Sequence, residues 1–238
     1  MASSQRPFYI ALMVVVVGGA VFIYSKVRSS GAISIPANIA VTPADTAGFR
    51  GYELGSASAP IEVTEYGDLE CPVCAAWATV QFPDVKTRLI DAGKVRWLYR
   101  DWPLDQAHRH PRISAHAAAC ANDQGKYWQA QDAMFARQND YALPDNPMPA
   151  LTDIMRSVGV NIDTWTACMK SGKYAGRIQA EEEIAMKVGG SGTPTFVIAG
   201  RLYDNRLTSD LMVKLVDSLI AAMPNKPTGA GPVVNGGR

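Results

Sequence analysis

A predicted strand that leads directly into two closely spaced cysteines constrains this chain more than any other feature. Residues 61–66 alternate between apolar and polar side chains, and Cys71 and Cys74 follow shortly afterwards. Residues 75–93 then show a helical pattern, which Pro83 should interrupt and Gly93 should end. A strand that delivers a Cys-X-X-Cys pair to the start of a helix is a specific setting for dithiol redox chemistry.

The surrounding residues argue against two other uses of paired cysteines. Haem attachment requires a histidine directly after the second cysteine, and Ala75 stands there. A structural zinc site needs four ligands, usually as two close pairs, whereas Cys120 and Cys168 are single and far apart. The histidines lack finger spacing, so we expect neither a metal ion nor another cofactor.

The helix start predicts different roles for the two thiols. Cys71 falls at the helix N-terminus, where unpaired backbone N–H groups and the helix dipole stabilise a thiolate. Pro72 suits the first turn, because its missing N–H would have had no partner there. Cys74 lies one turn later, close enough to form a small disulfide and release a bound partner. We therefore predict that Cys71 is the nucleophile and Cys74 the resolving thiol.

The rest of the pattern gives strand–helix–strand, a helical block, and then helix–strand–strand–helix. The further strands are predicted at residues 94–100, 195–199 and 201–203. The further helices are predicted at residues 111–122, 126–139, 151–158, 163–171, 174–188 and 209–223. This order predicts one mixed sheet with helices on both faces. The acidic run Glu181-Glu182-Glu183 is interpreted as a solvated helix face.

The N-terminal residues predict a membrane segment. Residues 8–24 carry no charge and would span roughly 26 Å as a helix, close to the thickness of the hydrocarbon layer. A cleaved signal peptide is the alternative, because small residues stand at positions 30–32. Lys26 and Arg28 separate that site from the apolar run, and the run is long for a signal peptide, so an uncleaved anchor is favoured.

Charge and cysteine content suggest a compartment and exclude one class of partner. The four cysteines are an even number, which is typical of an oxidising compartment, so the globular part is expected outside the cytoplasm. A net charge of +1 argues against nucleic acid, because no basic stripe is available to neutralise phosphates.

Four stretches of the chain carry a more specific signal. They are SAPIEVTEYGDLECPVC, YRDWPLDQAH, AAACANDQGKYWQAQDAMF and GGSGTPTFVIAGRLYD. Together they resemble the DsbA-like disulfide oxidoreductases, a branch of the thioredoxin superfamily, over residues 59–223. The resemblance implies an α/β thioredoxin fold with a helical insertion domain, here preceded by one N-terminal transmembrane helix.

The resemblance also implies roles for particular residues. Pro194 would follow a cis peptide bond, with Thr193 presenting its backbone to Cys71 and to an extended substrate segment. Glu65 would be the buried acid beneath the active site that accepts protons from Cys74.

Cys120 and Cys168 correspond to a structural disulfide found in some membrane-anchored and extracytoplasmic relatives. Closing the loop between them would stabilise the helical block by roughly 4 kcal/mol in the chain-entropy description. Two buried free thiols are the alternative, since a lone cysteine is often simply part of a core.

The expected organisation has four parts. They are a membrane anchor over residues 1–25, a linker over 26–50, a DsbA-like thioredoxin domain over 51–223 with its helical insertion at about 105–172, and a disordered tail over 224–238.

The expected function is that of a DsbA-like protein disulfide oxidoreductase with a Cys71–Cys74 redox-active disulfide. It would introduce disulfide bonds into unfolded or reduced exported proteins. The apolar N-terminal run and the even number of cysteines together predict a single-pass protein of the cell inner (cytoplasmic) membrane with a periplasmic domain. A membrane redox partner of the DsbB or vitamin-K-epoxide-reductase type would reoxidise it.

Two departures from the family pattern keep other functions open. Val73 stands where the strongest oxidants carry His, and Thr193 stands where the most studied oxidases carry Val. The nearest alternative is a disulfide reductase or isomerase kept reduced by a membrane electron donor. A non-catalytic thioredoxin-fold module that binds or chaperones extended chains is the alternative from another class.

Overall fold

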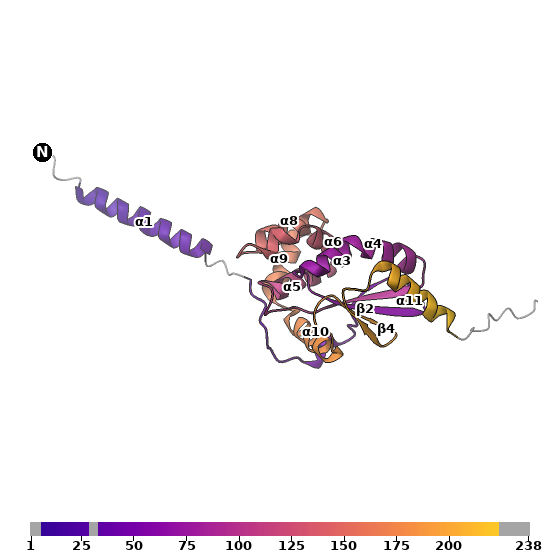
Figure 1. Cartoon of the computed structure of the whole chain (residues 1–238). Coiled ribbons are helices and arrows are strands. Elements are labelled where there is room, and N and C mark those ends of the chain that lie inside the picture. Colours follow the sequence, from indigo (N-terminus) through magenta and orange to yellow (C-terminus); the bar gives the residue numbers. More distant parts are fainter. Residues whose placement is uncertain (1–5, 29–32, 224–238) are drawn as a thin grey trace, which may run out of the picture.

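A five-stranded mixed sheet forms the centre of the computed structural model, which describes residues 6–28 and 33–223 (Figure 1). The strands are β1 (Tyr52–Leu54), β2 (Ile61–Gly67), β3 (Val95–Asp101), β4 (Thr195–Ile198) and β5 (Arg201–Tyr203). Their order is β1-β3-β2-β4-β5, with β2 and β3 parallel and the other neighbouring pairs antiparallel. The sequence predicted every strand except β1. Strand β2, which leads to the cysteines, lies in the middle of the sheet.

The register of the central strands groups side chains by face. Glu65 of β2 lies opposite Tyr99 of β3 and Phe196 of β4. Successive side chains of a strand point to opposite faces, so Glu65 and Val63 share one face while Tyr66 lies on the other.

Helices from both ends of the domain cover the face that carries Glu65. They are α3 (Pro72–Val80), α4 (Phe82–Val85), the π-helix η1 (Lys86–Ile90) and α11 (Ser209–Ala221). The rings of Trp77 in α3 and Phe196 in β4 pack with centroids 4.6 Å apart, and Trp97 stacks on Trp77 at 5.8 Å. The predicted interruption at Pro83 is observed as the change from α3 to α4.

Helix α10 (Ala175–Val188) packs against the opposite face, and one of its acidic residues corrects the sequence interpretation. Glu181 has no exposed surface. Its carboxylate accepts hydrogen bonds from Nε and Nη2 of Arg100 at 2.7 and 2.6 Å. The run was expected to be solvated, but Arg100 of β3 compensates the buried charge of Glu181.

The helical insertion lies between β3 and α10. It comprises α5 (Pro111–Asn122), α6 (Tyr127–Ala136), α7 (Gln138–Ala142), α8 (Met148–Ser157) and α9 (Ile162–Ser171). Their apolar faces form one core with Cys74 and with Tyr52 and Tyr99 of the sheet. The expected α/β architecture with a helical insertion is confirmed.

The N-terminal segment differs in part from its prediction. Residues 8–24 lie within a helix, α1 (Arg6–Arg28), as expected. Within the described ranges, however, no helix is both long and apolar enough to cross a membrane. The assignment of residues 1–25 as a membrane anchor stays a prediction.

The segment predicted as a free linker packs on the domain over part of its length. Ile35 is buried against Ala175 and Ile178 of α10, and the backbone N–H of Asn38 donates to Oε1 of Gln179 at 2.8 Å. A short helix, α2 (Pro43–Thr46), follows. Isolated isoleucines among small residues gave no periodic signal, although they bury apolar surface here. Residues 29–32 and the tail 224–238, predicted to be disordered, lie outside the described residues.

Candidate active site

The cysteine pair lies at the start of α3, shortly after the end of β2. Cys71 is the N-cap of α3 with an extended backbone, and Pro72 occupies the first turn. The backbone N–H of Cys71 donates to the carbonyl oxygen of Asp68 at 3.0 Å, which closes a tight turn before the helix. Both Cys71 and Cys74 are thiols in this structure. The helix therefore begins where the sequence predicted it.

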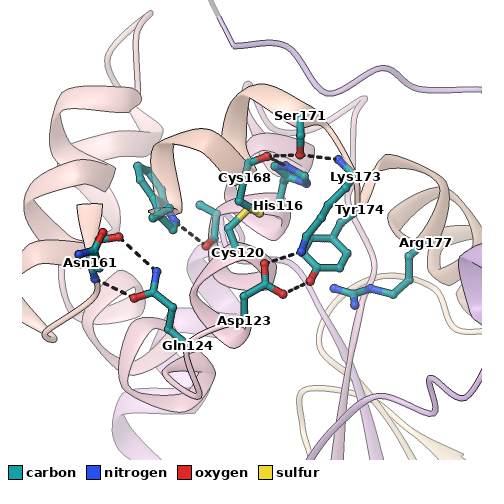
Figure 2. Close-up of a disulfide and its surroundings, with 12 residues drawn as sticks. His116, Cys120, Asp123, Gln124, Asn161, Cys168, Ser171, Lys173, Tyr174 and Arg177 are labelled. Carbon is teal, nitrogen blue, oxygen red and sulfur yellow. Dashed lines mark hydrogen bonds and ion pairs between the residues drawn. A yellow bond between two sulfur atoms is a disulfide. The ribbon is translucent and has the colours of Figure 1, made fainter. Parts of the chain in front are cut away.

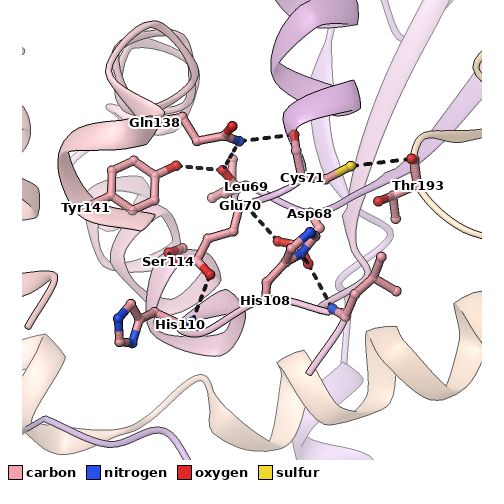
Figure 3. A network of polar contacts seen from close by, with 11 residues as sticks. Asp68, Leu69, Glu70, Cys71, His108, His110, Ser114, Gln138, Tyr141 and Thr193 are labelled. Atoms are coloured by element: carbon pink, nitrogen blue, oxygen red, sulfur yellow. Dashed lines mark hydrogen bonds and ion pairs between the residues drawn. The ribbon is translucent and has the colours of Figure 1, made fainter. Parts of the chain in front are cut away.

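A loop from the far end of the domain faces Cys71. The Thr193–Pro194 peptide bond is cis, and β4 begins directly after it. The thiol of Cys71 donates to the carbonyl oxygen of Thr193 at 3.5 Å (Figure 3). The structure thus brings together three of the predicted site residues from two distant parts of the sequence.

The surroundings of Cys71 favour its thiolate. The pKa of Cys71 is lowered from 9.0 to about 5, chiefly by a hydrogen bond from the Cys74 thiol. The Thr193 side chain and the backbone N–H groups of Cys74 and Val73 add to this effect, while burial opposes it. Cys71 is therefore ready to act as a nucleophile and as a leaving group near neutral pH.

Cys74 has the opposite character. Its side chain has no exposed surface. Burial raises the pKa of Cys74 well above its usual value, and the thiolate of Cys71 and the charge of Glu65 raise it further. Cys74 thus stays protonated under conditions in which Cys71 is ionised, a difference that the roles predicted for the two thiols would require.

Glu65 lies in the core beneath the pair. It is 4% exposed, so it is buried as the family resemblance implied. Burial raises the pKa of Glu65 from 4.5 to about 8, and the side chain of Trp97 opposes this rise. A carboxyl group that is largely uncharged at neutral pH can both give and take a proton.

The insertion holds the loop that carries Cys71 by its backbone. Nε2 of Gln138 donates to the carbonyl oxygens of Leu69 and Cys71 at 2.8 and 3.0 Å. The hydroxyl of Tyr141 donates to the same Leu69 oxygen at 2.6 Å. Figure 3 shows both donors, from α7, converging on the turn before α3. The position of Cys71 thus depends on side chains about seventy residues away in the sequence.

Two acids flank Leu69 and tie the same turn to the segment before α5. The buried carboxylate of Asp68 accepts hydrogen bonds from the backbone of Glu70 and Leu104 at 2.8 Å and from Nδ1 of His108 at 2.7 Å. Glu70 accepts a hydrogen bond from the backbone N–H of His110 at 2.8 Å. The hydrogen bonds of these two acids thus hold the turn before α3 against the segment that precedes α5.

Two clefts open beside Cys71. One, of about 400 Å³, is lined by polar and apolar side chains that include Glu70, Pro72, His108 and Gln138. The other, of about 260 Å³, is lined by residues of α3 that include the exposed Val73. Polar and apolar side chains line both clefts.

The second pair of cysteines lies away from this site, in the insertion. Cys120 of α5 and Cys168 of α9 are joined by a disulfide (Figure 2). His116 lies beside it, and Nε2–H of His116 donates to the carbonyl oxygen of Cys168 at 3.2 Å. Burial lowers the pKa of His116 to about 4. The ligand atoms of the three residues lie within 4.8 Å of one another, but with the sulfurs bonded the group offers one free ligand and does not make a metal site.

The sequence interpretation missed Asp68, His108, Gln138 and Tyr141. The acid three residues before Cys71 was a readable signal, because Asp commonly accepts backbone hydrogen bonds in turns. The other three gave none, since their contacts depend on how the insertion folds back onto the turn.

Comparison with known proteins agrees with the fold. A family model described as thioredoxin matches residues 50–218. Among solved structures, DsbA of Chlamydia trachomatis superposes with a TM-score of 0.66 at 16% identity, covering 78% of this chain and 98% of that one.

Two curated relatives illustrate what the similarity covers. The Na(+)/H(+) antiporter NhaA 3 of Salinispora tropica is 29% identical over 180 residues, which cover 76% of this chain but 26% of the antiporter. A Rickettsia prowazekii protein named as a protein-disulfide oxidoreductase is 26% identical over 168 residues, covering 70% of this chain and 60% of that protein. The chain thus spans about a quarter of the antiporter's length.

Proposed function

This chain belongs to the thioredoxin family, and from that premise we propose that it is a thiol-disulfide oxidoreductase whose redox centre is the Cys71–Cys74 pair. The observation that carries the proposal is the contrast between two neighbouring thiols. The pKa of Cys71 is lowered to about 5, whereas burial raises that of Cys74. Structural thiols in a core have no need of such a difference, but a nucleophile and its resolving partner do.

In the proposed oxidative cycle, a substrate thiolate attacks Sγ of Cys71 in the disulfide form. The Cys71–Cys74 bond breaks, its electron pair stays on the sulfur of Cys74, and that sulfur takes a proton, for which Glu65 is the nearby donor. A second substrate thiolate then attacks the substrate sulfur of the mixed disulfide. Cys71 leaves as a stable thiolate, and two electrons have passed from the substrate to the protein.

The direction of electron flow is proposed as oxidative. The low pKa of Cys71 stabilises the reduced form of the protein, and a stabilised reduced form makes a dithiol the stronger oxidant. Val73 limits this tendency, because it provides no hydrogen-bond donor to the thiolate. Equilibration of the full chain with glutathione tests the point. A potential well above about −200 mV supports the oxidase, whereas one near −270 mV supports the reductase or isomerase.

A trapping experiment separates the oxidoreductase from a non-catalytic binding module. Cys74→Ser removes the resolving thiol, so mixed disulfides through Cys71 should accumulate with exported proteins. Cys71→Ser should form none. A non-reducing gel of the two variants isolated from cells shows the difference. Equal adducts from both, or none from either, would replace the oxidoreductase with the binding module.

Substrates, partners and location extend the proposal and rest on the sequence. The substrates would be unfolded or reduced exported proteins, and a membrane redox partner of the DsbB or vitamin-K-epoxide-reductase type would take up the two electrons. The domain would act outside the cytoplasm, with residues 1–25 at the inner membrane. Carbonate washing of membranes tests the attachment, and release of the full-length chain into the wash contradicts it.

A further inference from the structure

We propose that His108, held by Asp68, is a positioning residue whose positive charge stabilises the Cys71 thiolate against the negative charge of Asp68. The inference rests on the proposed function, because it takes Cys71 to be the reactive thiol. It adds a residue from outside the Cys-X-X-Cys motif to the groups that set the reactivity of that thiol.

The geometry joins these three residues through one turn. Asp68 and Cys71 are the first and last residues of the turn closed by the 3.0 Å hydrogen bond between their backbones. The Asp68 side chain has no exposed surface, and its carboxylate accepts the hydrogen bond from Nδ1 of His108 at 2.7 Å. Figure 3 shows the imidazole of His108 against Asp68, below the turn that carries Cys71. A buried carboxylate in the same turn as a thiolate would repel it, and the imidazolium offsets that repulsion.

His108 also opens onto the cleft beside the nucleophile. Its side chain is 15% exposed and lines the same cleft as Glu70 and Pro72, the two neighbours of Cys71 in the chain. The described residues of α7 contribute the uncharged amides of Gln138 and Asn139 to that cleft. His108 therefore occupies the side from which a substrate segment would approach.

The charged groups around His108 favour its protonated form. The hydrogen bond to Asp68 is the largest cause that raises the pKa of His108 above 6.5, and the charges of Cys71 and Glu70 add to it, while burial opposes them. The charge of the neighbouring Arg109 is paired with that of Asp145, with which it forms an ion pair at 2.7 Å. Coupling between two sites is reciprocal: if the Cys71 thiolate favours the imidazolium, the imidazolium favours the thiolate equally.

Two substitutions with opposite expected effects test the proposal on the reduced, full-length protein. His108→Gln removes the cation and leaves the Asp68 carboxylate uncompensated, so the pKa of Cys71 should rise by roughly 0.5–1 unit. Asp68→Asn removes the anion and should leave the pKa of Cys71 unchanged or lower it. The thiolate absorbance at 240 nm, followed from pH 3 to 8 and corrected with Cys71→Ser, measures both. A purely structural role would move both variants in the same direction.

Three further proteins sharpen the comparison. His108→Lys keeps a cation and should restore the pKa, while the double variant Asp68→Asn/His108→Gln should return it toward the wild-type value. His110→Gln is the matched control, because the His110 ring bonds the carbonyl oxygen of Pro144 and not the active-site turn. For His108→Gln, alkylation of Cys71 at pH 5 should slow roughly threefold. A threefold change in the equilibrium between the dithiol and disulfide forms of the protein would lower its reduction potential by about 15 mV.

The outcomes distinguish the inference from the function beneath it. Equal Cys71 titrations in the wild type, His108→Gln and Asp68→Asn would overturn the role of His108 while leaving the oxidoreductase intact. A wild-type protein in which no thiol titrates below pH 7 and no exchange occurs would overturn the proposed function itself. A rise for His108→Gln with recovery in His108→Lys and in the double variant supports the inference.

Discussion

The thiol of Cys71 lies 3.5 Å from the carbonyl oxygen of Thr193, a residue 122 positions further along the chain. This contact places the start of α3 against the loop that leads into β4. A substrate segment that reached Cys71 would therefore meet the backbone of Thr193 at the same time.

The two motif thiols should titrate separately in the reduced protein. Because the pKa of Cys71 is lowered to about 5 and that of Cys74 is raised well above 9, one thiolate should form between roughly pH 4 and 6. Iodoacetamide at pH 7 should modify Cys71 much faster than Cys74, which peptide mapping by mass spectrometry measures. Similar rates at both positions would contradict the assignment of nucleophile and resolving thiol.

Replacing the buried acid should stabilise the protein at alkaline pH. The pKa of Glu65 is raised to about 8, so its folded state resists ionisation, whereas the unfolded chain ionises near pH 4.5. The stability associated with the uncharged carboxyl is therefore complete below about pH 4.5 and is lost as the pH rises toward 8. At pH 8.5, Glu65→Gln should unfold at a higher urea concentration than the wild type. Its free energy of unfolding should be larger by an amount on the order of 2–4 kcal/mol.

At pH 4 the Glu65→Gln variant and the wild type should unfold at similar urea concentrations, which serves as the internal control. The same variant should slow the step that releases Cys74, since Gln has no proton to give. A stability difference that does not change between pH 4 and 8.5 would mean that the pKa of Glu65 is the same in the folded and unfolded protein.

The second disulfide should prove structural. Cys120 and Cys168 are buried or nearly so, and 48 positions separate them in the sequence. Mild dithiothreitol treatment should expose two thiols, Cys71 and Cys74, to alkylation, as mass spectrometry would show. The double variant Cys120→Ser/Cys168→Ser should lower the free energy of unfolding by roughly 4 kcal/mol and leave the titration of Cys71 unchanged. Alkylation of all four cysteines to the same extent would defeat this assignment.

The contact from the insertion to the active-site turn should matter for both stability and reactivity. Tyr141→Phe removes the hydroxyl that donates to the carbonyl oxygen of Leu69, which should cost about 1 kcal/mol in urea unfolding. Exchange through Cys71 should also slow, because the turn loses one of its supports. Tyr203→Phe on β5 is the matched control, since its hydroxyl makes no hydrogen bond in the part of the chain described. Equal behaviour of the two variants would remove Tyr141 from the site.

The features that the sequence predicted correctly were governed by local signals. The strand before Cys71, the helix that begins at Pro72 and the break at Pro83 each follow from residues within a few positions. Thr193 and Pro194 were located through a short motif whose residues are contiguous. Helix periodicity likewise located α5, whose observed ends match those predicted.

Predictions failed where a residue's environment depends on a distant partner. Glu181 resembled its neighbours in an acidic run, and only its pairing with Arg100 of β3 explains why it is buried. Asp68 and His108 are 40 positions apart, so no local pattern joins them. Ile35, in the predicted linker, is buried by α10, which follows it by more than a hundred residues.

Because of the hydrogen bonds from Gln138 and Tyr141, the reactive motif cannot be transferred to another fold without losing part of its support. The turn before Cys71 is held through its carbonyl oxygens, which any sequence would provide, by two side chains that only the insertion provides. Residues 68–74 grafted onto a thioredoxin fold without α7 would keep the cysteines and the helix start but lose the external clamp on Leu69. Conversely, the seven-residue motif can change its side chains without disturbing the clamp. The insertion is thus the part of the chain through which the orientation of Cys71 can be tuned independently of the motif.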